Sequence, residues 1–594
     1  MAAPRRLAAS RVLAGFGLAT LVALSLADLD LARPDPWLTL RRIGAGLVAP
    51  QIGDPAALAR AAALTVAFAV CGVFAGALAG LGLSFGYRLR PIRGLCILVR
   101  SVHELFWALL LLGITGLGPL TGVLAIALPY TGIFAKVFAE YLAEADPAAG
   151  RALPRRTPPL SRLLWSRLPL ALPELGAYTL YRLECGLRSS AVLGFVGLPT
   201  LGYLLETDFR QANYGAAAAT LGVYLALILP IRYWMRLRLA PLWLGISVWL
   251  LSRHPTPPMG DGALWRFMND AVPAPIRSGD WAGLWPWLGK LLGDQALPGV
   301  IATLILSQLA LALAAAVAVI GFPLIVRRVA GRMGTLLGHL ALVLSRSIPD
   351  YMLAFLILQV TGPSMIPAIL ALGLHNGAII AHLMGRQGDA LMPKLRPDAP
   401  RGLRLAAWEL LPRLSGNFFA LCLYRWEIVV RDSAILGLLG IATLGFYVDA
   451  AVQELRTDRA VLLLMVAAML TLGIDTLSGW IRARMRLSAP GMRQAEPEQL
   501  TVGSLRLDRA QQWAEAGDMR LDLTPLQFRL LWQLVAQRGE VLSKPYLYRV
   551  VLDREFSRYD RSLDMHISRI RRRLIDAGLG DVLQTQHGRG YLFA

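Results

Sequence analysis

Two stretches decide how this sequence folds: YRLECGLRSSAVLGFVG at 181–197 and YRWEIVVRDSAILGLLG at 424–440. They correspond at a constant offset of 243, and the correspondence extends without a gap over 168–203 and 411–446. Apolar composition can imitate the shared leucines, but it does not produce a shared Tyr-Arg-x-Glu-x-x-x-Arg. The chain is therefore internally duplicated, which predicts two similar halves around a pseudo-two-fold axis.

The composition places this duplication in a membrane. Of the 594 residues, 56% are hydrophobic and 17% are charged, and the mean hydropathy is +0.52. Long apolar runs separated by short Arg-rich segments are typical of membrane-spanning helices. We therefore predict an α-helical polytopic membrane protein with about twelve spans, six in each half. The predicted spans lie near 11–29, 57–84, 95–117, 119–142, 171–197, 215–235, 240–252, 299–326, 335–360, 364–385, 415–446 and 459–481.

The distribution of charge predicts the topology. The net charge is +21, and many of the arginines flank apolar runs, as Arg327 and Arg328 do. By the positive-inside rule, such Arg-rich loops face the cytoplasm. We therefore expect a multi-pass protein of the bacterial inner membrane, in contact with its lipid, with both termini cytoplasmic. The expected parts are a first half at 1–238, a second half at 239–486, a linker at 487–499 and a C-terminal domain at 500–594.

Charged residues within the apolar spans are the candidates for a substrate pathway. Each costs at least ~2.5–3.5 kcal/mol at the centre of a span, so such side chains usually face the bundle interior and have partners. The spacing predicts ion pairs of the i,i+4 type on single helices. The candidate pairs are Glu184 with Arg188, Glu427 with Arg431, Arg100 with Glu104, and Arg346 with Asp350, while Arg182 and Arg425 point elsewhere on their helices.

Two interpretations of these charges remain open. In the first, the arginines form a cationic ring near the two-fold axis that guides an anionic substrate. In the second, they form interhelical salt bridges that hold the bundle together, because each arginine has an acid within reach. Both apply if the bridges rearrange during transport.

The sequence predicts no metal site, no cofactor and no enzymatic activity. The four cysteines lie in apolar stretches without C-x-x-C spacing, as expected of buried thiols. His375 and His382 are seven residues apart, but no third ligand is evident. No nucleophile–base constellation appears either, so no catalytic residue is proposed.

Three stretches resemble the phosphonate-type permease subunits of ABC importers. They are GLGPLTGVLA at 116–125, YTGIFAKVFAE at 130–140, and the region around 180–197. The resemblance is strong over 60–235 and weaker over 300–482. It implies a phosphonate or related phosphorus oxyanion as substrate, delivered by a periplasmic substrate-binding protein. It also implies a separate ABC ATPase subunit, because no G-x-x-x-x-G-K-[ST] motif occurs in the sequence.

The segments that should couple to an ATPase depart from this family. Its members carry a cytoplasmic coupling helix with a Glu-Ala pair and a Gly ahead of a Leu-Pro. Here the stretch 150–159 contains three prolines, which oppose a regular helix, and Arg151 stands about where the acid belongs. The corresponding stretch 394–402 is similarly altered. The departure puts ATPase coupling in doubt.

The C-terminal region resembles the OmpR-type winged helix over nearly its whole length. LTPLQFRLL at 523–531 matches the first helix, with Thr524 as N-cap and Pro525 in the first turn. The stretch 560–574 matches the recognition helix, and 585–591 matches the wing hairpin. The resemblance implies a small α+β domain that binds DNA.

A basic recognition helix suits the major groove, where guanidinium groups read base edges and phosphates. The alternative is a solvated basic face with no DNA bound. The candidates for DNA contact are Arg561, His566, Arg569, Arg572, Arg573 and, on the wing, Arg589.

Two functions are compatible with these features. In the first, the chain is the permease of an importer for phosphonate-like anions, with a regulatory DNA-binding domain attached. In the second, it is a membrane-embedded one-component transcription regulator whose permease-like part is the sensor. The duplicated cores favour the first function, and the altered coupling segments favour the second.

Overall fold

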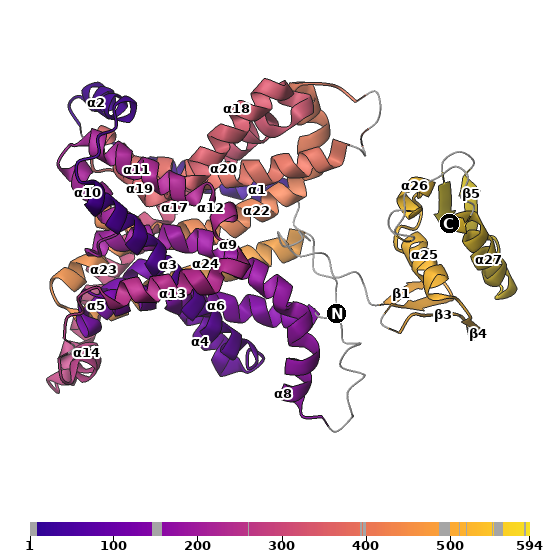
Figure 1. The fold of residues 1–594 in the computed structure, drawn as a ribbon, viewed down its shortest axis with the longest axis horizontal. Coiled ribbons are helices and arrows are strands. Elements are labelled where there is room, and N and C mark those ends of the chain that lie inside the picture. Colours follow the sequence, from indigo (N-terminus) through magenta and orange to yellow (C-terminus); the bar gives the residue numbers. More distant parts are fainter. Residues whose placement is uncertain are drawn as a thin grey trace. The chain divides into compact units, whose positions relative to one another are not determined.

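The computed structural model divides into two compact units, residues 1–490 and 491–594, and each is described by itself (Figure 1). In the first unit it describes residues 9–31, 33–144, 157–258, 260–392, 395 and 399–485. In the second unit it describes residues 499–509, 511–517, 519–548, 551, 562–586 and 590–593. The predicted linker therefore lies almost entirely outside the described residues, and so do most of the altered coupling segments.

In the first unit, which we call the membrane body, the regular secondary structure of the described residues is all helical. Its first half contains α1 Ala9–Leu26, α2 Pro36–Val48, α3 Pro55–Ser84, α4 Arg90–Ser101, α5 Glu104–Thr115, α6 Pro119–Glu144, α8 Pro159–Arg162, α9 Leu168–Val192, α10 Leu201–Arg210, α11 Tyr214–Ile228 and α12 Ile231–Trp234. Its second half contains α13 Ala240–Ser252, α14 Ala263–Asp270, α15 Ala274–Arg277, α16 Trp281–Leu291, α17 Leu297–Gly321, α18 Arg327–Ser347, α19 Asp350–Thr361, α20 Ile366–Leu391, α21 Leu403–Leu405, α22 Leu411–Asp432, α23 Leu444–Gln453 and α24 Thr457–Met485.

Several of these helices are long and apolar enough to cross a membrane. In the described part of the chain there are five by length and composition, or up to eight if each sharply bent pair of helices counts as one span. The five are Pro55–Ser84, Pro119–Ala143, Trp281–Ile325, Ile366–Leu391 and Thr457–Met485. The membrane character is thus clear, while the full set of twelve spans stays a prediction.

Two predicted spans are not continuous helices. The span at 95–117 is the pair α4 and α5, which meet at 95°, and the span at 335–360 is the pair α18 and α19, which meet at 93°. Between α18 and α19 stands Pro349, and the residue before a proline is driven out of the helical region; Ile348 accordingly has ψ 125°. In the first half, His103 caps α5 by accepting a hydrogen bond from the Leu105 N–H, which fixes a new helix start.

The predicted span at 415–446 is also interrupted. Helix α22 ends at Asp432, a short 3₁₀ turn follows, and Gly440 has φ +84°, which favours glycine. Beyond it, α23 returns so closely that a Cβ on Gly445 would overlap the carbonyl of Ala434. The glycines at equivalent positions of the duplication produce the same break after α9, where Gly197 has φ +95°.

Small residues bring the central helices of each half together. In the first half α3 packs along α6, where a Cβ on Gly76 would come within 2.9 Å of the Tyr130 Cβ. In the second half α17 packs along α20, where a Cβ on Gly377 would come within 2.6 Å of the Val317 Cβ. Such small-residue contacts allow backbones to approach closely within a bilayer.

The first helix of each predicted half packs on the other half. Helix α1 lies against α17, where the Gln308 side chain donates to the Phe16 carbonyl and the Thr20 hydroxyl. Helix α13 lies against α3. The two sequence halves are therefore interlocked, each contributing one helix to its partner.

A wide helical turn precedes each of three Leu-Pro pairs. At 163–167, 292–296 and 406–410 the backbone forms a π turn, and in each case the leucine N–H then bonds to the carbonyl five residues earlier. The proline that follows lacks an N–H, and its ring would clash with the carbonyl four residues before it. The π turn relieves that clash without ending the helix.

The second unit is a small α+β domain. Strands β1 Gln499–Val502, β2 Leu505–Asp508, β3 Trp513–Ala516 and β4 Met519–Leu521 form an antiparallel sheet in sequence order. The helices are α25 Pro525–Ala536, α26 Lys544–Leu547 and α27 Ser562–Asp576, and β5 Leu583–Gln586 pairs with β6 Gly590–Phe593 as a hairpin. Apolar side chains of all three helices and both sheets form one core.

The predicted start of the first helix in this domain is confirmed. Thr524 accepts a hydrogen bond from the Gln527 N–H, and the Gln527 side chain accepts one from the Thr524 N–H. This reciprocal capping box, with Pro525 in the first turn, fixes where α25 begins. Helix α27 is amphipathic and turns Leu563, Ile567, Ile570 and Leu574 toward the core.

Candidate functional site

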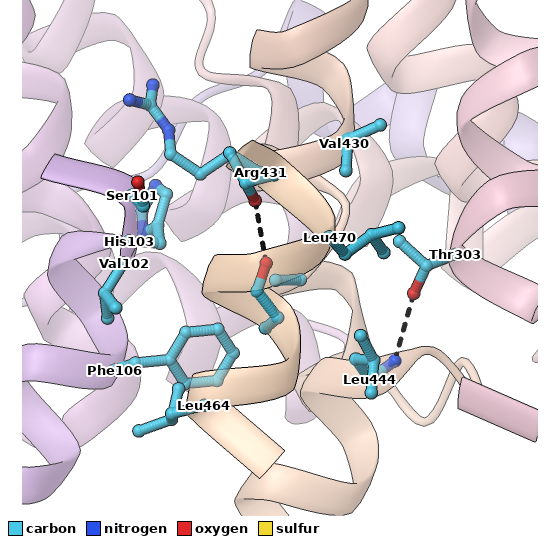
Figure 2. A pocket seen from close by; sticks show the side chains of 13 residues that line it. Ser101, Val102, His103, Phe106, Thr303, Val430, Arg431, Leu444, Leu464 and Leu470 are labelled. Carbon is cyan, nitrogen blue, oxygen red and sulfur yellow. Dashed lines mark hydrogen bonds between the residues drawn. The ribbon is translucent and has the colours of Figure 1, made fainter. Parts of the chain in front are cut away.

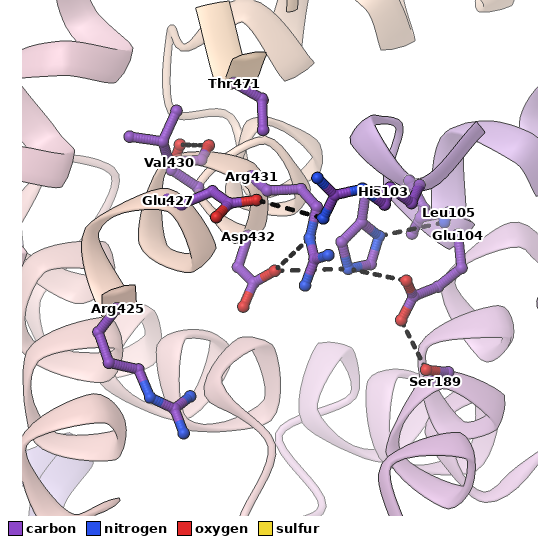
Figure 3. A network of polar contacts seen from close by, with 12 residues as sticks. His103, Glu104, Leu105, Ser189, Arg425, Glu427, Val430, Arg431, Asp432 and Thr471 are labelled. Carbon is purple, nitrogen blue, oxygen red and sulfur yellow. Dashed lines mark hydrogen bonds and ion pairs between the residues drawn. The ribbon is translucent and has the colours of Figure 1, made fainter. Parts of the chain in front are cut away.

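A polar network lies where helices of the two halves meet in the membrane body (Figure 3). The imidazole of His103 lies 3.4 Å from a Glu104 oxygen and 3.9 Å from an Asp432 oxygen. Glu104 accepts a 2.6 Å hydrogen bond from the Ser189 hydroxyl, and Arg431 approaches Asp432 at 3.3 Å. The network thus joins α5 and α9 of the first half to α22 of the second.

The two buried histidines are held in opposite tautomers. Nδ1 of His103 accepts a hydrogen bond from the Leu105 N–H, so Nε2 bears the proton that faces the two carboxylates. Nδ1 of His375 faces the Ile348 carbonyl at 3.0 Å and donates to it, which leaves Nε2 to accept from Arg188 at 3.5 Å. Each neutral ring is therefore oriented by backbone atoms at a helix junction.

Arg100 makes a second bridge between the halves. Its guanidinium lies 3.9 Å from Glu427 on α22 and 3.5 Å from Asp475 on α24. Arg100 is the last basic residue of α4, and the sharp turn into α5 directs it toward the second half. Asp475 was missed in the sequence because it lies in the apolar run of α24 without a motif around it.

Of the four predicted i,i+4 pairs, one is confirmed. Arg188 lies 3.3 Å from Glu184 on α9. In the second half, Glu427 instead binds Arg100 and Arg431 binds Asp432, so the predicted pair on α22 is wrong.

The predicted pairs of Arg100 with Glu104 and of Arg346 with Asp350 are wrong as single-helix pairs, because a sharp turn separates their members. Arg346 belongs to the last turn of α18, and Asp350 begins α19. Asp350 instead accepts a hydrogen bond from the N–H of the next residue, Tyr351, in the first turn of α19.

Arg182 and Arg425 occupy equivalent positions and bind neutral groups. Arg182 donates through Nε to the Tyr178 hydroxyl at 2.8 Å and lies over the rings of Tyr178 and Tyr181. Arg425 donates to the Asn376 side-chain oxygen at 3.5 Å. Figure 3 shows its guanidinium turned away from the acids of the network. Neither arginine forms an ion pair with a carboxylate of the described chain.

A small pocket adjoins this network (Figure 2). It lies between residues 101–106 of the first half and α22, α23 and α24 of the second, and its volume of about 20 Å³ admits roughly one water molecule. His103 and Arg431 line one side, and the remaining lining is mostly aliphatic. The hydroxyl of Thr303 accepts a hydrogen bond from the Leu444 N–H beside it.

The described residues contain no group of three or more His, Cys, Asp or Glu side chains that would hold a metal ion. The four cysteines are free thiols, and Cys71, Cys96 and Cys422 are buried.

In the C-terminal domain, the basic residues of α27 differ in their freedom to contact a ligand. Arg569 and Arg572 are exposed. Arg573 lies 3.6 Å from Asp522 and is half-buried. Arg561 and Arg589 lie outside the described residues.

Two further residues shape the surface of α27. Arg571, which we did not select from the sequence, donates to the Leu583 carbonyl and the Thr585 hydroxyl and so ties the helix to the β5–β6 hairpin. Partial burial and the neighbouring positive charge of Arg569 lower the pKa of His566, which favours the neutral form of its ring.

Each of the two units is similar to known proteins. The phosphate-import permease protein PhnE of Mycolicibacterium smegmatis is 26% identical over 478 residues, covering 74% of this chain and 88% of the relative. The phosphite transport system permease protein PtxC of Stutzerimonas stutzeri is 36% identical over 133 residues, covering 22% of this chain and 48% of the relative.

The C-terminal unit has its own relatives. The family described as "Transcriptional regulatory protein, C terminal" matches residues 518–593. The transcriptional regulatory protein CpxR of Escherichia coli is 39% identical over 94 residues, covering 16% of this chain and 40% of CpxR. The membrane body is therefore homologous to the phosphonate- and phosphite-type importer permeases, and fused to it the chain carries a C-terminal OmpR-type DNA-binding domain of transcriptional regulators.

Proposed function

We propose that the membrane body moves a phosphorus oxyanion, such as phosphonate, phosphite or phosphate, across the bacterial inner membrane. The observation that carries this proposal is the extent of the likeness to PhnE, which spans 88% of that permease. The names of PhnE and PtxC associate these relatives with phosphate and phosphite. A periplasmic substrate-binding protein would deliver the anion, and a separate ABC ATPase would drive its passage.

The proposed architecture is six spans in each half, twelve in all, with both termini in the cytoplasm. The halves comprise 1–238 and 239–486, apart from the helices α1 and α13 that pack on the opposite half. A cytoplasmic C-terminus gives the DNA-binding domain, 500–594, access to the chromosome. The reciprocal packing of α1 and α13 supports a pseudo-two-fold arrangement.

Within this body we assign different roles to the two groups of arginines. Arg100 binds carboxylates of α22 and α24 and so joins the halves, whereas Arg188 and Arg431 bind carboxylates on their own helices. Arg182 and Arg425 bind only neutral partners in the described chain, so their positive charge is available to an anion. Guanidinium groups suit oxyanions because they donate paired hydrogen bonds.

Transport by the purified full chain tests this assignment. The protein is reconstituted in vesicles with its ATPase and binding protein, and ATP-dependent uptake of labelled phosphite, phosphonate and sulfate is compared. Uptake of the phosphorus oxyanions alone is expected. Arg182→Gln and Arg425→Gln should each lower uptake by on the order of tenfold, from the loss of one charge-assisted hydrogen bond of about 1.5 kcal/mol.

A matched control is Arg210→Gln, because Arg210 is 70% exposed and, among the described residues, forms its ion pair with Glu206 on its own helix. It should transport normally. Unchanged uptake in both pathway variants, with normal folded yield, would refute the role of Arg182 and Arg425. Equal uptake of sulfate would refute the substrate class.

A second function, a membrane-embedded one-component regulator, is favoured by the sequence of the coupling segments. The prolines at 150–159 and the altered stretch at 394–402 disfavour the regular helix that would dock into an ATPase. If the body is a sensor, the chain takes up no anion, and the substrate or its binding protein changes DNA affinity instead. Measuring DNA binding by the reconstituted full chain with and without phosphite distinguishes the two functions.

DNA binding itself is assigned to the C-terminal domain. On α27 we assign the contacts first to Arg569 and Arg572, which are exposed. His566 lies beside them, and Arg573 is turned toward Asp522. Arg561 and Arg589 are retained from the sequence as contacts at the start of the helix and on the wing.

A further inference from the structure

A second, larger groove lies on the membrane body, away from the polar network. Helices α3, α11, α12 and α13 line it, and its volume is about 330 Å³. Apart from Ser247 its lining is apolar, with Ala63 and Ala226 exposed along it and the indoles of Trp234 and Trp243 among the lining side chains. The groove therefore offers room to a hydrocarbon ligand within the span.

The polar N–H groups of the two lining tryptophans are bonded within the protein. The Trp234 N–H donates to the Leu227 carbonyl at 2.9 Å, and the Trp243 N–H donates to the Trp234 carbonyl at 3.1 Å. The rings pack edge to face with centroids 5.2 Å apart. Because both donors are used within the protein, this part of the groove recognises an apolar ligand.

The shape of the groove suits a fatty acyl chain. Its lining runs along α13 from Trp243 to Leu250, and seven residues of helix rise about 10 Å. Helix α13 packs along α3, which is itself long and apolar enough to span the bilayer. An extended chain in the groove would thus lie along the span, as lipid tails do.

The tryptophan end of the groove adjoins positive charge. Arg236 and Arg238 follow Trp234 within four residues, precede α13, and are both exposed. Tryptophans and arginines at the end of a span mark the bilayer surface, where the headgroups lie. Basic residues there attract anionic lipids by about 1 kcal/mol each.

We propose that this groove is a specific site for one anionic phospholipid. An acyl chain occupies the groove between α3, α11 and α13, and the phosphate of the headgroup lies against Arg236 and Arg238. Because α13 belongs to the second sequence half and α3 and α11 to the first, the bound lipid reinforces the contact between the interlocked halves.

Native mass spectrometry of the delipidated full chain tests the proposal. The protein in neutral detergent is titrated with phosphatidylglycerol, with phosphatidylcholine of the same acyl chains, and with inorganic phosphate alone. One retained phosphatidylglycerol is expected, with an affinity on the order of tenfold above that of phosphatidylcholine. Equal retention of the two lipids would overturn the proposal, and so would displacement of phosphatidylglycerol by free phosphate.

Two variants separate the headgroup from the acyl chain. Arg236→Gln with Arg238→Gln should remove the preference for phosphatidylglycerol, whereas Arg327→Gln with Arg328→Gln, the same change at exposed arginines outside the groove, should preserve it. Ala63→Phe should fill the groove and abolish retention of the lipid.

Ala79→Phe is the control for the filled groove, because Ala79 is exposed on α3 and does not line it. It should retain the lipid. Unchanged retention in the folded Ala63→Phe variant would overturn the site, and unchanged preference in the Arg236/Arg238 variant would overturn the headgroup contact.

Discussion

The two halves carry the same Glu-x-x-x-Arg motif but use it differently. On α9 the pair closes on one helix, with Arg188 at 3.3 Å from Glu184. On α22 Arg431 binds Asp432 at 3.3 Å, while Glu427 lies 3.9 Å from an arginine of the first half. One copy of the motif therefore stabilises its own helix, and the other copy joins two halves.

A single position accounts for much of this difference. The duplication aligns Ser189 with Asp432, so only the second half has an extra acid next to its arginine. That acid accepts from Arg431 and leaves Glu427 to bind across the junction. Ser189 instead donates to Glu104, which is also a contact between different helices. A motif shared by two repeats thus predicts the participating residues but not their partners.

The largest effect should come from removing the acid that breaks the symmetry. Asp432→Ala leaves Arg431 without its partner, and unpairing a buried charge costs about 3–5 kcal/mol. The Asp432 side chain is only 17% exposed, so solvent compensates little. We expect a strong loss of thermal stability in detergent-purified protein.

Glu454→Gln is the matched control for this prediction. Glu454 also faces an arginine, at 3.6 Å, but its side chain is 61% exposed, so the change should cost no more than about 1 kcal/mol. If Asp432→Ala and Glu454→Gln destabilise the protein equally, the comparison of the two halves is wrong.

A smaller effect is expected in the C-terminal domain. Arg569→Ala should weaken DNA binding by about 1–3 kcal/mol if the guanidinium reads a base. If it contacts a phosphate, the slope of log affinity against log salt should fall by about 1. Both quantities are measured with the isolated segment 491–594, a separate compact unit with its own core.

The control for Arg569→Ala is Arg506→Ala, because Arg506 is exposed on strand β2 of the same domain. It should leave affinity and salt slope nearly unchanged. The DNA contact is excluded if both variants bind DNA as the unaltered segment does.

The charged residues of the membrane body could be predicted from the sequence because the same charged motif occurs in both halves. The Tyr-Arg-x-Glu motif identified Arg182 and Arg425, and the capping pattern at Thr524 gave the start of α25. The sequence did not predict the breaks at His103 and Pro349, because apolar periodicity continues through them while local backbone geometry ends the helix.

The ion-pair partners of the charged residues could not be predicted from the sequence either. Asp475 approaches Arg100 from a helix 375 positions later in the chain, and no local pattern predicts such a contact. Likewise, the packing of α1 on α17 depends on how the two halves assemble, which spacing within one helix does not encode.

The smallest effect concerns pH and His566. Its pKa is lowered in the folded domain, so folding favours the neutral ring, and the resulting stability is present above pH 6.5 and lost as the pH falls through the folded-state pKa. Urea unfolding of segment 491–594 should therefore show a slightly lower midpoint just below pH 6.5. His566→Gln should remove that dependence; a dependence of equal size in the variant would assign it to another group.

The central claim is that ion pairs between the two halves stabilise the contact between them. A double-mutant cycle on Arg100 and Glu427 tests it most directly. Stability of Arg100→Gln, Glu427→Gln and the double variant is measured by equilibrium unfolding in mixed micelles. We predict a coupling of about 1 kcal/mol or more, above that of the Arg210–Glu206 pair, whose arginine is exposed, measured in the same way. Additive effects of the two substitutions would contradict the account.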